Sequence, residues 1–223
     1  GEYLYGGIER IIKGAMKATL KNPKESVFLG KYTLSAKKAA KIRKAYEESN
    51  IHIPAFLIAS ITTQCNLHCA GCYARANQCC SDVVSLGQLT NEEWNTVFSQ
   101  AEDLGVSFIL LAGGEPFLRR DVVEEAAKHK DIIFPVFTNG TMFEEKYMKL
   151  FDENRNLVPI LSIEGQKEAT DMRRGVGMYE TLQENMTNLQ RKGILYGVSV
   201  TVTKSNLEEV MSKAFTDMLV DKG

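Results

Sequence analysis

The first fifth of the chain has apolar side chains at helical spacing among many basic ones. Residues 7–21 and 34–50 each predict an amphipathic helix, with Pro23 between them and Ser35 expected as the cap of the second. We therefore expect a helical extension over residues 1–50. Its basic faces are compatible with a membrane surface or a protein partner. A solvated face on a helix packed against the rest of the protein is the simpler interpretation.

A different pattern begins at Pro54, where continuous apolar runs rich in β-branched residues alternate with amphipathic segments. The apolar runs predict five strands, over residues 55–63, 107–114, 132–140, 157–165 and 195–206. The first run, AFLIASITT, is apolar throughout, which is typical of a strand that is buried on both faces of a sheet.

The amphipathic segments predict a helix after each strand, over residues 90–105, 120–130, 143–154, 178–193 and 207–223. The first begins with a capping box of Thr90 and Glu93 and ends at Gly105, and Asn206 is expected to cap the last. Strand–helix alternation with short connections indicates a parallel α/β fold. The alternation alone does not separate a barrel from an open, doubly wound sheet.

A polar motif follows each predicted strand. The motifs are the cysteine loop (residues 63–72), GGEP (113–116), TNG (138–140), SIEG (162–165) and TKSN (203–206). Because the carboxyl ends of parallel strands meet at one edge of a sheet, we expect these motifs to form one shared site.

The composition is that of an ordinary globular chain, with 223 residues, 44% hydrophobic residues and a net charge of −1. This charge gives no reason to expect a nucleic-acid or membrane-surface partner. We find no run of about eighteen apolar residues that would span a membrane, and no secretory signal at the start. Five cysteines, three of them in the cysteine loop, favour metal-bound thiolates in a reducing, cytoplasmic setting over a disulfide framework.

The three cysteines of the loop have the spacing C-x3-C-x2-C and are Cys65, Cys69 and Cys72. A closed zinc site needs a fourth ligand, for which His68, Cys79 and Cys80 are nearby candidates. A four-cysteine ferredoxin cluster would also need Cys79 or Cys80. The third alternative is a 4Fe–4S cluster with three cysteine ligands. Its open iron can bind the amine and carboxylate of an exogenous amino acid and pass one electron into the bound molecule.

From about residue 54 onward the chain resembles the radical S-adenosylmethionine (radical SAM) superfamily. The resemblance rests on the cysteine spacing, on GGEP at the next strand end and on the repeated β/α units. The stretches LAGGEPFLR, FTNGTMF, LSIEG and VTVTKSNLEEV look most similar to its SPASM-type, peptide-modifying and sulfatase-maturing branch. The resemblance implies that Cys65, Cys69 and Cys72 hold a 4Fe–4S cluster and that S-adenosylmethionine (SAM) chelates the open iron. It also implies reductive cleavage of SAM to a 5′-deoxyadenosyl radical that abstracts hydrogen from a substrate.

The resemblance also implies a fold, which is a partial (β/α)6 TIM-like barrel over residues 51–223 behind the helical extension of residues 1–50. The family barrel usually has six strand–helix units, and this sequence predicts five. SPASM-type proteins carry further cysteines downstream, and none follows Cys80 here. We therefore expect a chain that is truncated at its C-terminus.

The GGEP motif is the first implied contact with SAM. Gly113 and Gly114 let the backbone approach a ligand closely, Glu115 offers a carboxylate to the SAM ammonium, and Pro116 stiffens the turn. Without the cysteine loop before it, the motif would be equally consistent with a tight βα turn.

Further contacts are implied at the next two strand ends. Ser162 and Arg174 match family positions that contact the SAM carboxylate or ribose, although Arg173 beside Arg174 leaves the register open by one residue. Glu164 stands where many relatives have Asp. For these residues a capping hydroxyl or a solvated loop charge is an equally open interpretation.

The adenine side of the pocket departs from the family pattern. Family members usually have an aromatic residue where this chain has Gly71, so Tyr73 is the expected stacking residue. Val202 is expected to pack on adenine or in the core. Thr138 and Asn139 are expected on the pocket floor, although Asn-Gly is also a generic turn.

The resemblance implies two partners. One is a substrate that the residues do not identify, with a peptide or protein as the family analogy, and the other is an external electron donor of flavodoxin or ferredoxin type. No nucleic-acid or membrane partner is expected. Two rival hypotheses stay open, which are a non-catalytic domain with structural zinc or an inert cluster, and an electron carrier with four cysteines.

Overall fold

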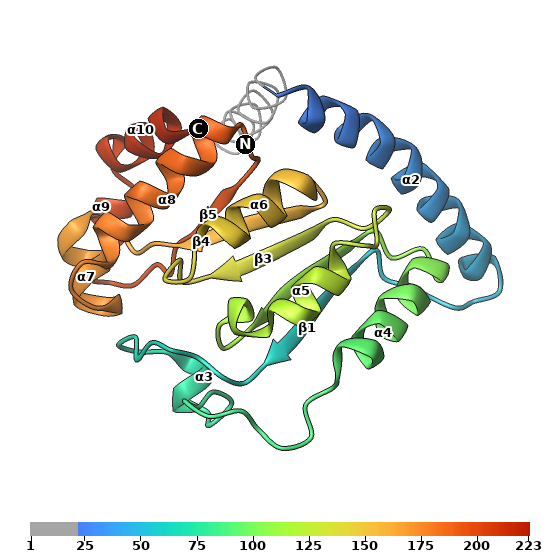
Figure 1. Cartoon of the computed structure of the whole chain (residues 1–223), viewed down its shortest axis with the longest axis horizontal. Coiled ribbons are helices and arrows are strands. Elements are labelled where there is room, and N and C mark those ends of the chain that lie inside the picture. Colours follow the sequence, from blue (N-terminus) through green and yellow to red (C-terminus); the bar gives the residue numbers. More distant parts are fainter. Residues whose placement is uncertain (1–21) are drawn as a thin grey trace.

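The computed structural model describes residues 22–223, and its centre is a five-stranded parallel sheet (Figure 1). The strands are β1 (Phe56–Thr62), β2 (Phe108–Gly113), β3 (Phe134–Thr138), β4 (Leu157–Ser162) and β5 (Gly197–Ser199). They lie side by side in the order β1-β2-β3-β4-β5, which is also their order in the chain. A doubly wound sheet reverses its strand order part-way, whereas a barrel does not. The sheet is therefore part of a TIM-like barrel, as predicted.

Helices connect the strands and cover one face of the sheet. They are α4 (Asn91–Asp103), α5 (Arg120–Ala126), α6 (Glu145–Glu153), α7 (Lys167–Arg174) and α8 (Met178–Lys192), with the short α3 (Tyr73–Ala76) and the 3-10 helix η1 (Pro116–Arg119). Helix α4 begins with the predicted capping box: Glu93 N donates to Thr90 Oγ1 at 3.2 Å and Thr90 N donates to Glu93 Oε2 at 2.8 Å. The core between sheet and helices includes fully buried Phe98, Leu111 and Phe151.

The edge strand β1 corrects the prediction that it is buried on both faces. Ala59 and Ile61 point into the core, whereas Phe56 and Ile58 are 46% and 65% exposed. Side chains of a strand alternate between its two faces. The helices of the described chain thus cover one face of β1 and leave the other open to solvent.

The N-terminal part of the described chain is one long helix, α2 (Pro23–Glu48), on the opposite side of the sheet from α3 and α7 (Figure 1). It begins at Pro23 with Asn22 as its cap. The expected cap at Ser35 is wrong, because Ser35 lies inside α2 and its hydroxyl donates to Asp131 Oδ1 at 2.6 Å. The predicted helix over residues 7–21 lies outside the described residues.

The contacts of α2 show which ends of the strands it covers. Tyr32 Oη donates to Ser107 O at 3.0 Å just before β2, and Asp131 lies just before β3. Arg155, just before β4, pairs with Glu25 at 3.0 Å, and both side chains are buried. Helix α2 therefore packs against the amino ends of the strands and leaves their carboxyl ends free.

The C-terminal segment differs from the single helix predicted over residues 207–223. It forms two helices, α9 (Leu207–Val210) and α10 (Lys213–Lys222), and the Ser212 hydroxyl caps the second. Asn206 precedes α9, but its side chain does not cap that helix. No helix among residues 22–223 combines the length and apolar character needed to cross a membrane.

Candidate active site

The cysteine loop lies at the carboxyl ends of the strands, between β1 and α3 (Figure 1). Its backbone is closed by a parallel bridge between Gln64 and Ser81. Cys65 N donates to Ser81 O at 2.9 Å, and Ser81 N donates to Thr63 O at 2.9 Å. The bridge fixes the start of the loop against the segment that carries Cys79 and Cys80.

Arg75 ties the same loop from inside, and no sequence motif pointed to it. Its Nε donates to Leu67 O at 2.9 Å and its Nη2 to Cys65 O at 3.1 Å. The same Nη2 lies 2.7 Å from Asp82 Oδ1, and Asp82 also meets His68 at 3.1 Å. These bonds orient the backbone on which the cysteines stand, and the His68 ring is hydrogen-bonded to Asp82.

The glycines of GGEP allow a close approach to the protein's own backbone, whereas the prediction was a close approach to a ligand. A Cβ on Gly113 would lie 2.2 Å from Thr62 O, and one on Gly114 would lie 2.1 Å from Gln64 O. Gly114 N and Glu115 N donate to these same two oxygens, each at 2.8 Å. The glycines therefore let this strand end approach the chain's own cysteine loop. Pro116, which begins η1, is buried beside it.

Glu115 is buried at the centre of the strand ends. Its Oε1 accepts from Thr138 Oγ1 at 2.7 Å and from Phe117 N at 3.1 Å, and its Oε2 accepts from Asn139 N at 2.7 Å. Burial raises the pKa of this carboxyl to about 7, and the three donors oppose the shift. The carboxylate thus holds the TNG turn within the protein. Its predicted bond to the SAM ammonium stays a prediction.

The TNG turn in its own right contacts the cysteine loop. Asn139 Nδ2 donates to Asn66 Oδ1 at 2.9 Å, and Asn66 Nδ2 donates to Thr141 Oγ1 at 2.8 Å. Thr138 and Asn139 are buried, and their predicted place on the floor of a SAM pocket stays a prediction. Asn66, which no sequence argument singled out, joins the loop to the end of β3.

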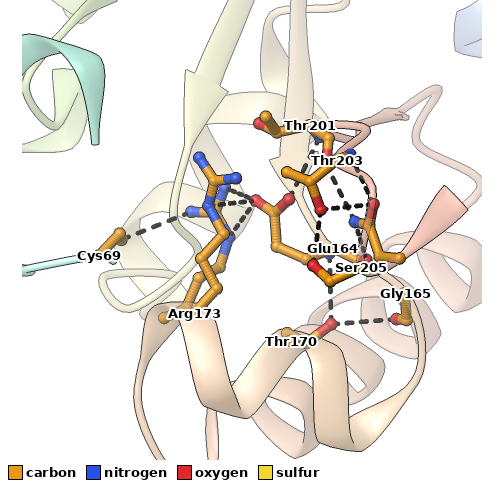
Figure 2. Close-up of polar contacts among 10 residues, drawn as sticks. Cys69, Glu164, Gly165, Thr170, Arg173, Thr201, Thr203 and Ser205 are labelled. Carbon is orange, nitrogen blue, oxygen red and sulfur yellow. Dashed lines mark hydrogen bonds and ion pairs between the residues drawn. The ribbon is translucent and has the colours of Figure 1, made fainter. Parts of the chain in front are cut away.

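A third strand end reaches the loop through an ion-pair network (Figure 2). The buried Glu164 accepts from Arg174 through Oε1, at 3.0 Å from Nε and also from Nη2, and its Oε2 accepts from Thr201 N at 3.2 Å. Arg174 Nη1 lies 3.9 Å from Cys69 Sγ. The network links the middle cysteine to the ends of β4 and β5. Ser162, the last residue of β4, pairs in register with Ser199 of β5.

The five thiols differ in their surroundings. Cys65, Cys69 and Cys72 are half-buried, Cys79 is exposed and Cys80 is buried. Burial raises the pKa of the Cys69 thiol, and the Arg174 guanidinium opposes the shift. Burial also raises the pKa of Cys80 to about 11, with Cys65 as a hydrogen-bonded neighbour. Cys80 therefore lies beside Cys65, whereas Cys79 is open to solvent.

The spacing of these side chains bears on the kind of group that they fit. Within residues 22–223, no three His, Cys, Asp or Glu side chains are gathered closely enough to hold a single metal ion. A 4Fe–4S cluster is larger than one ion, because each cysteine binds a different iron. The three half-buried thiols of the loop match in number the three cysteine ligands of a 4Fe–4S cluster with one open iron.

The backbone explains why residue 71 is glycine. Gly71 has φ +68, a left-handed conformation that is costly for an aromatic residue, although a Cβ there would meet nothing within 4 Å. Tyr73 is 75% exposed on α3, and Val202 is 55% exposed just after β5. The interpretation of Val202 as a core residue is therefore wrong. Both side chains are free to contact a ligand, and their predicted roles beside adenine stay predictions.

A parallel β/α half-barrel with a three-thiol loop at the carboxyl ends of its strands defines a class, the barrel proteins that bind an iron–sulfur cofactor at that edge. The chain belongs to the Radical SAM superfamily, whose family model matches residues 59–213. The cofactors of this superfamily, a 4Fe–4S cluster and SAM, are those expected from the sequence.

Curated relatives match most of this chain. Fe-coproporphyrin III synthase of Methanosarcina barkeri is 30% identical over 169 residues, which cover 74% of this chain and 41% of the relative. The sporulation killing factor maturation protein SkfB of Bacillus subtilis is 26% identical over 162 residues, which cover 71% of this chain and 38% of the relative. The chain thus spans about two fifths of the length of these relatives.

Solved structures show the same fold. The crystal structure of Streptococcus suis SuiB bound to the precursor peptide SuiA has a TM-score of 0.65 and 19% identity. The match covers 83% of this chain and 40% of SuiB. At this identity the likeness shows the fold alone, and it confirms the predicted partial barrel.

Proposed function

We propose that this chain is the catalytic β/α domain of a radical SAM enzyme, with a 4Fe–4S cluster held by Cys65, Cys69 and Cys72. The observation that carries the proposal is that two successive strand ends and the end of helix α7 all hold the cysteine loop. GGEP bonds to its start, TNG bonds to Asn66 and the end of α7 bonds to Ala70 and Cys69. When bound, the cluster and SAM would supply the one-electron chemistry of the superfamily.

The arginine pair at the end of α7 fits an anionic ligand. Arg173 Nε is buried and makes no hydrogen bond to the described residues, and it lies 3.5 Å from Glu164 Oε1. Two guanidinium groups meet one buried carboxylate here, which leaves a positive charge uncompensated. We assign Arg173 and Arg174 to the SAM carboxylate, with Ser162 beside them at the end of β4. Since Nε and Nη2 of Arg174 are already bonded to Glu164, Arg173 has more N–H groups left for the ligand.

The remaining SAM contacts belong to the same strand ends. Glu115 and its bonds to Thr138 and Asn139 fix the turns around the site and exclude water from beneath it. The backbone of Gly113 and Gly114 can offer the SAM ammonium acceptors that the buried carboxylate side chain does not expose. Tyr73 and Val202 are exposed at the rim, where they can contact adenine.

The substrate is proposed to be a peptide or a protein, bound at the carboxyl ends of the strands. Support comes from the names of relatives, one a maturation protein for a killing factor and one solved with a precursor peptide. The name Fe-coproporphyrin III synthase favours a second candidate, which is a tetrapyrrole. An external one-electron donor, such as flavodoxin or ferredoxin, is required in either case.

Anaerobic reconstitution of the full-length protein tests this function. We expect the three loop cysteines to account for about four irons per chain and, with dithionite and SAM, release of 5′-deoxyadenosine. Ala at Cys65, Cys69 or Cys72 should remove these irons and abolish the release, and Cys79→Ala is the matched control that should keep both. A protein that binds the irons but leaves SAM intact would contradict the proposal, and zinc retained in equal amount to protein would favour the structural-metal alternative. Cys80→Ala decides whether a fourth thiol is needed, as an electron carrier would require.

A further inference from the structure

The end of helix α7 contacts the cysteine loop at two consecutive residues. Ala70 N donates to Arg173 O at 2.8 Å, which fixes the backbone of the loop against the helix. The next residue, Arg174, places Nη1 at 3.9 Å from Cys69 Sγ. This N···S distance is within the range of hydrogen bonds to the large sulfur atom. The sequence-level role of Arg174, a contact with SAM, does not account for a bond to a cluster ligand.

Glu164 fixes the orientation of Arg174 (Figure 2). The Glu164 side chain is 1% exposed, and its Oε1 receives both Nε and Nη2 of Arg174. Its Oε2 accepts from Thr201 N, and its backbone N donates to Thr170 Oγ1 at 3.2 Å. The carboxylate and the backbone of Glu164 are thus each fixed by a hydrogen bond, and the carboxylate in turn orients the guanidinium.

The shape of a guanidinium determines where its third nitrogen points once the other two are bonded to Glu164. Its planar fork can place two N–H groups on a carboxylate while the third nitrogen points away. Here that third nitrogen is Nη1, on the side of Cys69. An ammonium on a flexible stem has no fixed third direction, so lysine at this position would not reproduce both contacts.

We propose that Glu164 and Arg174 are a positioning pair that delivers one N–H to the Cys69 sulfur and thereby raises the reduction potential of the cluster. Hydrogen bonds to ligand sulfurs are one of the terms that set the potential of iron–sulfur clusters. A nearby donor and positive charge stabilise the reduced cluster, which carries one more negative charge, over the oxidised one. This inference rests on the proposed cluster site.

The Glu164–Arg174 pair is also linked to the end of strand β5. Because Oε2 of Glu164 is bonded to the backbone just after β5, a movement of that strand end would move Arg174 relative to Cys69. Asn206 Nδ2 strengthens the link, since it donates to Glu164 O at 2.8 Å and to Thr201 O at 3.0 Å. The donor to the cluster ligand is therefore held by the strand end on the far side of the site from β1.

The test is an EPR-monitored redox titration of the reconstituted full-length protein without SAM. Arg174→Lys keeps the charge and loses the fork, so we expect a more negative midpoint potential at unchanged iron content. Arg173→Lys is the matched control, because within residues 22–223 it is Arg174, and not Arg173, that donates to a cysteine sulfur, and its midpoint should equal that of the wild type. Glu164→Asp keeps the negative charge but is one methylene shorter, so it frees the guanidinium and should shift the potential in the same direction as Arg174→Lys.

Each outcome is decisive. Equal midpoints for the wild type, Arg174→Lys and Glu164→Asp, or an equal shift for Arg173→Lys, overturn the positioning role and leave the cluster site intact. If Arg174→Lys fails to take up iron, Glu164→Asp carries the same comparison. A wild-type protein that takes up no iron contradicts the proposed function and this inference with it. Intact clusters with a more negative midpoint in Arg174→Lys and Glu164→Asp, and an unchanged midpoint in Arg173→Lys, support both.

Discussion

Glu115 is fully enclosed by the turns around the cysteine loop, and this burial gives the protein a pH-dependent stability. Its pKa is raised from 4.5 to about 7. Between these two values the unfolded chain releases the proton while the folded chain retains it. The free energy of unfolding therefore falls as the pH rises through this range, and the fall from this one group is about 3 kcal/mol.

Glu115→Gln cannot ionise and should remove that fall. Urea unfolding of the apoprotein at pH 5 and pH 8 measures the effect, as the difference between wild type and variant at each pH. Glu124→Gln is the control, since Glu124 is part-exposed in an ion pair with Arg120, and its pH slope should match the wild type. A slope unchanged by Glu115→Gln would show that the buried carboxyl does not titrate in this range.

Gly114 shows how one missing Cβ positions the site. A methyl group at this residue would overlap Gln64 O at 2.1 Å and would lie 3.1 Å from Cys65 N, both backbone atoms of the cysteine loop. We expect Gly114→Ala to lower the free energy of unfolding by about 1–3 kcal/mol and to reduce iron uptake. Gly30→Ala is the matched control, because nothing lies within 4 Å of its Cβ in helix α2. It should stabilise the protein by about 0.5–1 kcal/mol, and equal effects of the two would refute this account.

Among single residues, the sequence identified those in motifs and missed those whose role depends on the fold. The three loop cysteines, Glu115 and Arg174 stand in recognisable patterns. Arg75 and Asn66 do not, because their partners are carbonyls and amides that only the folded chain brings near. Cys80 was visible as a cysteine, but its contact with Cys65 depends on the bridge between Gln64 and Ser81.

At the scale of elements, helix α2 is fixed to the sheet by the buried pair of Glu25 and Arg155. Arg155→Met would leave the Glu25 carboxylate, which is 0% exposed, without its cation. We expect a loss of about 3–5 kcal/mol in the free energy of unfolding. The double variant Glu25→Met with Arg155→Met should recover most of it, because no buried charge is left unpaired.

A double-mutant cycle by urea unfolding measures this coupling. Lys213→Met is the control, since its ion pair with Asp217 is exposed and should contribute little. Additive losses from the two single variants would mean that the pair does not act as a unit, and that α2 is held by its other contacts along the amino ends of the strands.

Elements with continuous apolar runs or capping patterns were predictable, and the others were not. The runs SFILLAGG and LVPILSIEG gave β2 and β4, and the capping box gave α4. Helix α7 was missed because Thr170 is its one buried residue, so it has no apolar stripe to detect. The strand order that decides between barrel and doubly wound sheet was not readable, because pairing joins residues far apart in the sequence.

At the scale of the whole molecule, the amino ends and the carboxyl ends of the strands have separate roles. Helix α2 packs on the amino ends, while at the carboxyl ends the cysteine loop is held by the ends of β2 and β3 and by the end of α7 (Figure 1). A loop tied at several points costs less to order when a cofactor binds, because its conformational entropy has already been lost on folding. The thiols are therefore expected to be preorganised before any cluster is present.

Hydrogen exchange of the apoprotein tests this preorganisation. The amides of Cys65, Ala70 and Glu115 donate to backbone oxygens within the site, at 2.9, 2.8 and 2.8 Å. They should exchange far more slowly than in an unstructured peptide.

Arg75→Gln removes the bonds to Leu67 O and Cys65 O, so it should speed exchange in residues 63–72 and leave the core strands unchanged. Arg191→Gln, which removes an exposed hydrogen bond to Asn188, should leave both unchanged. Loop amides that exchange freely in the wild-type apoprotein would mean that the cluster, and not the sheet edge, orders the loop.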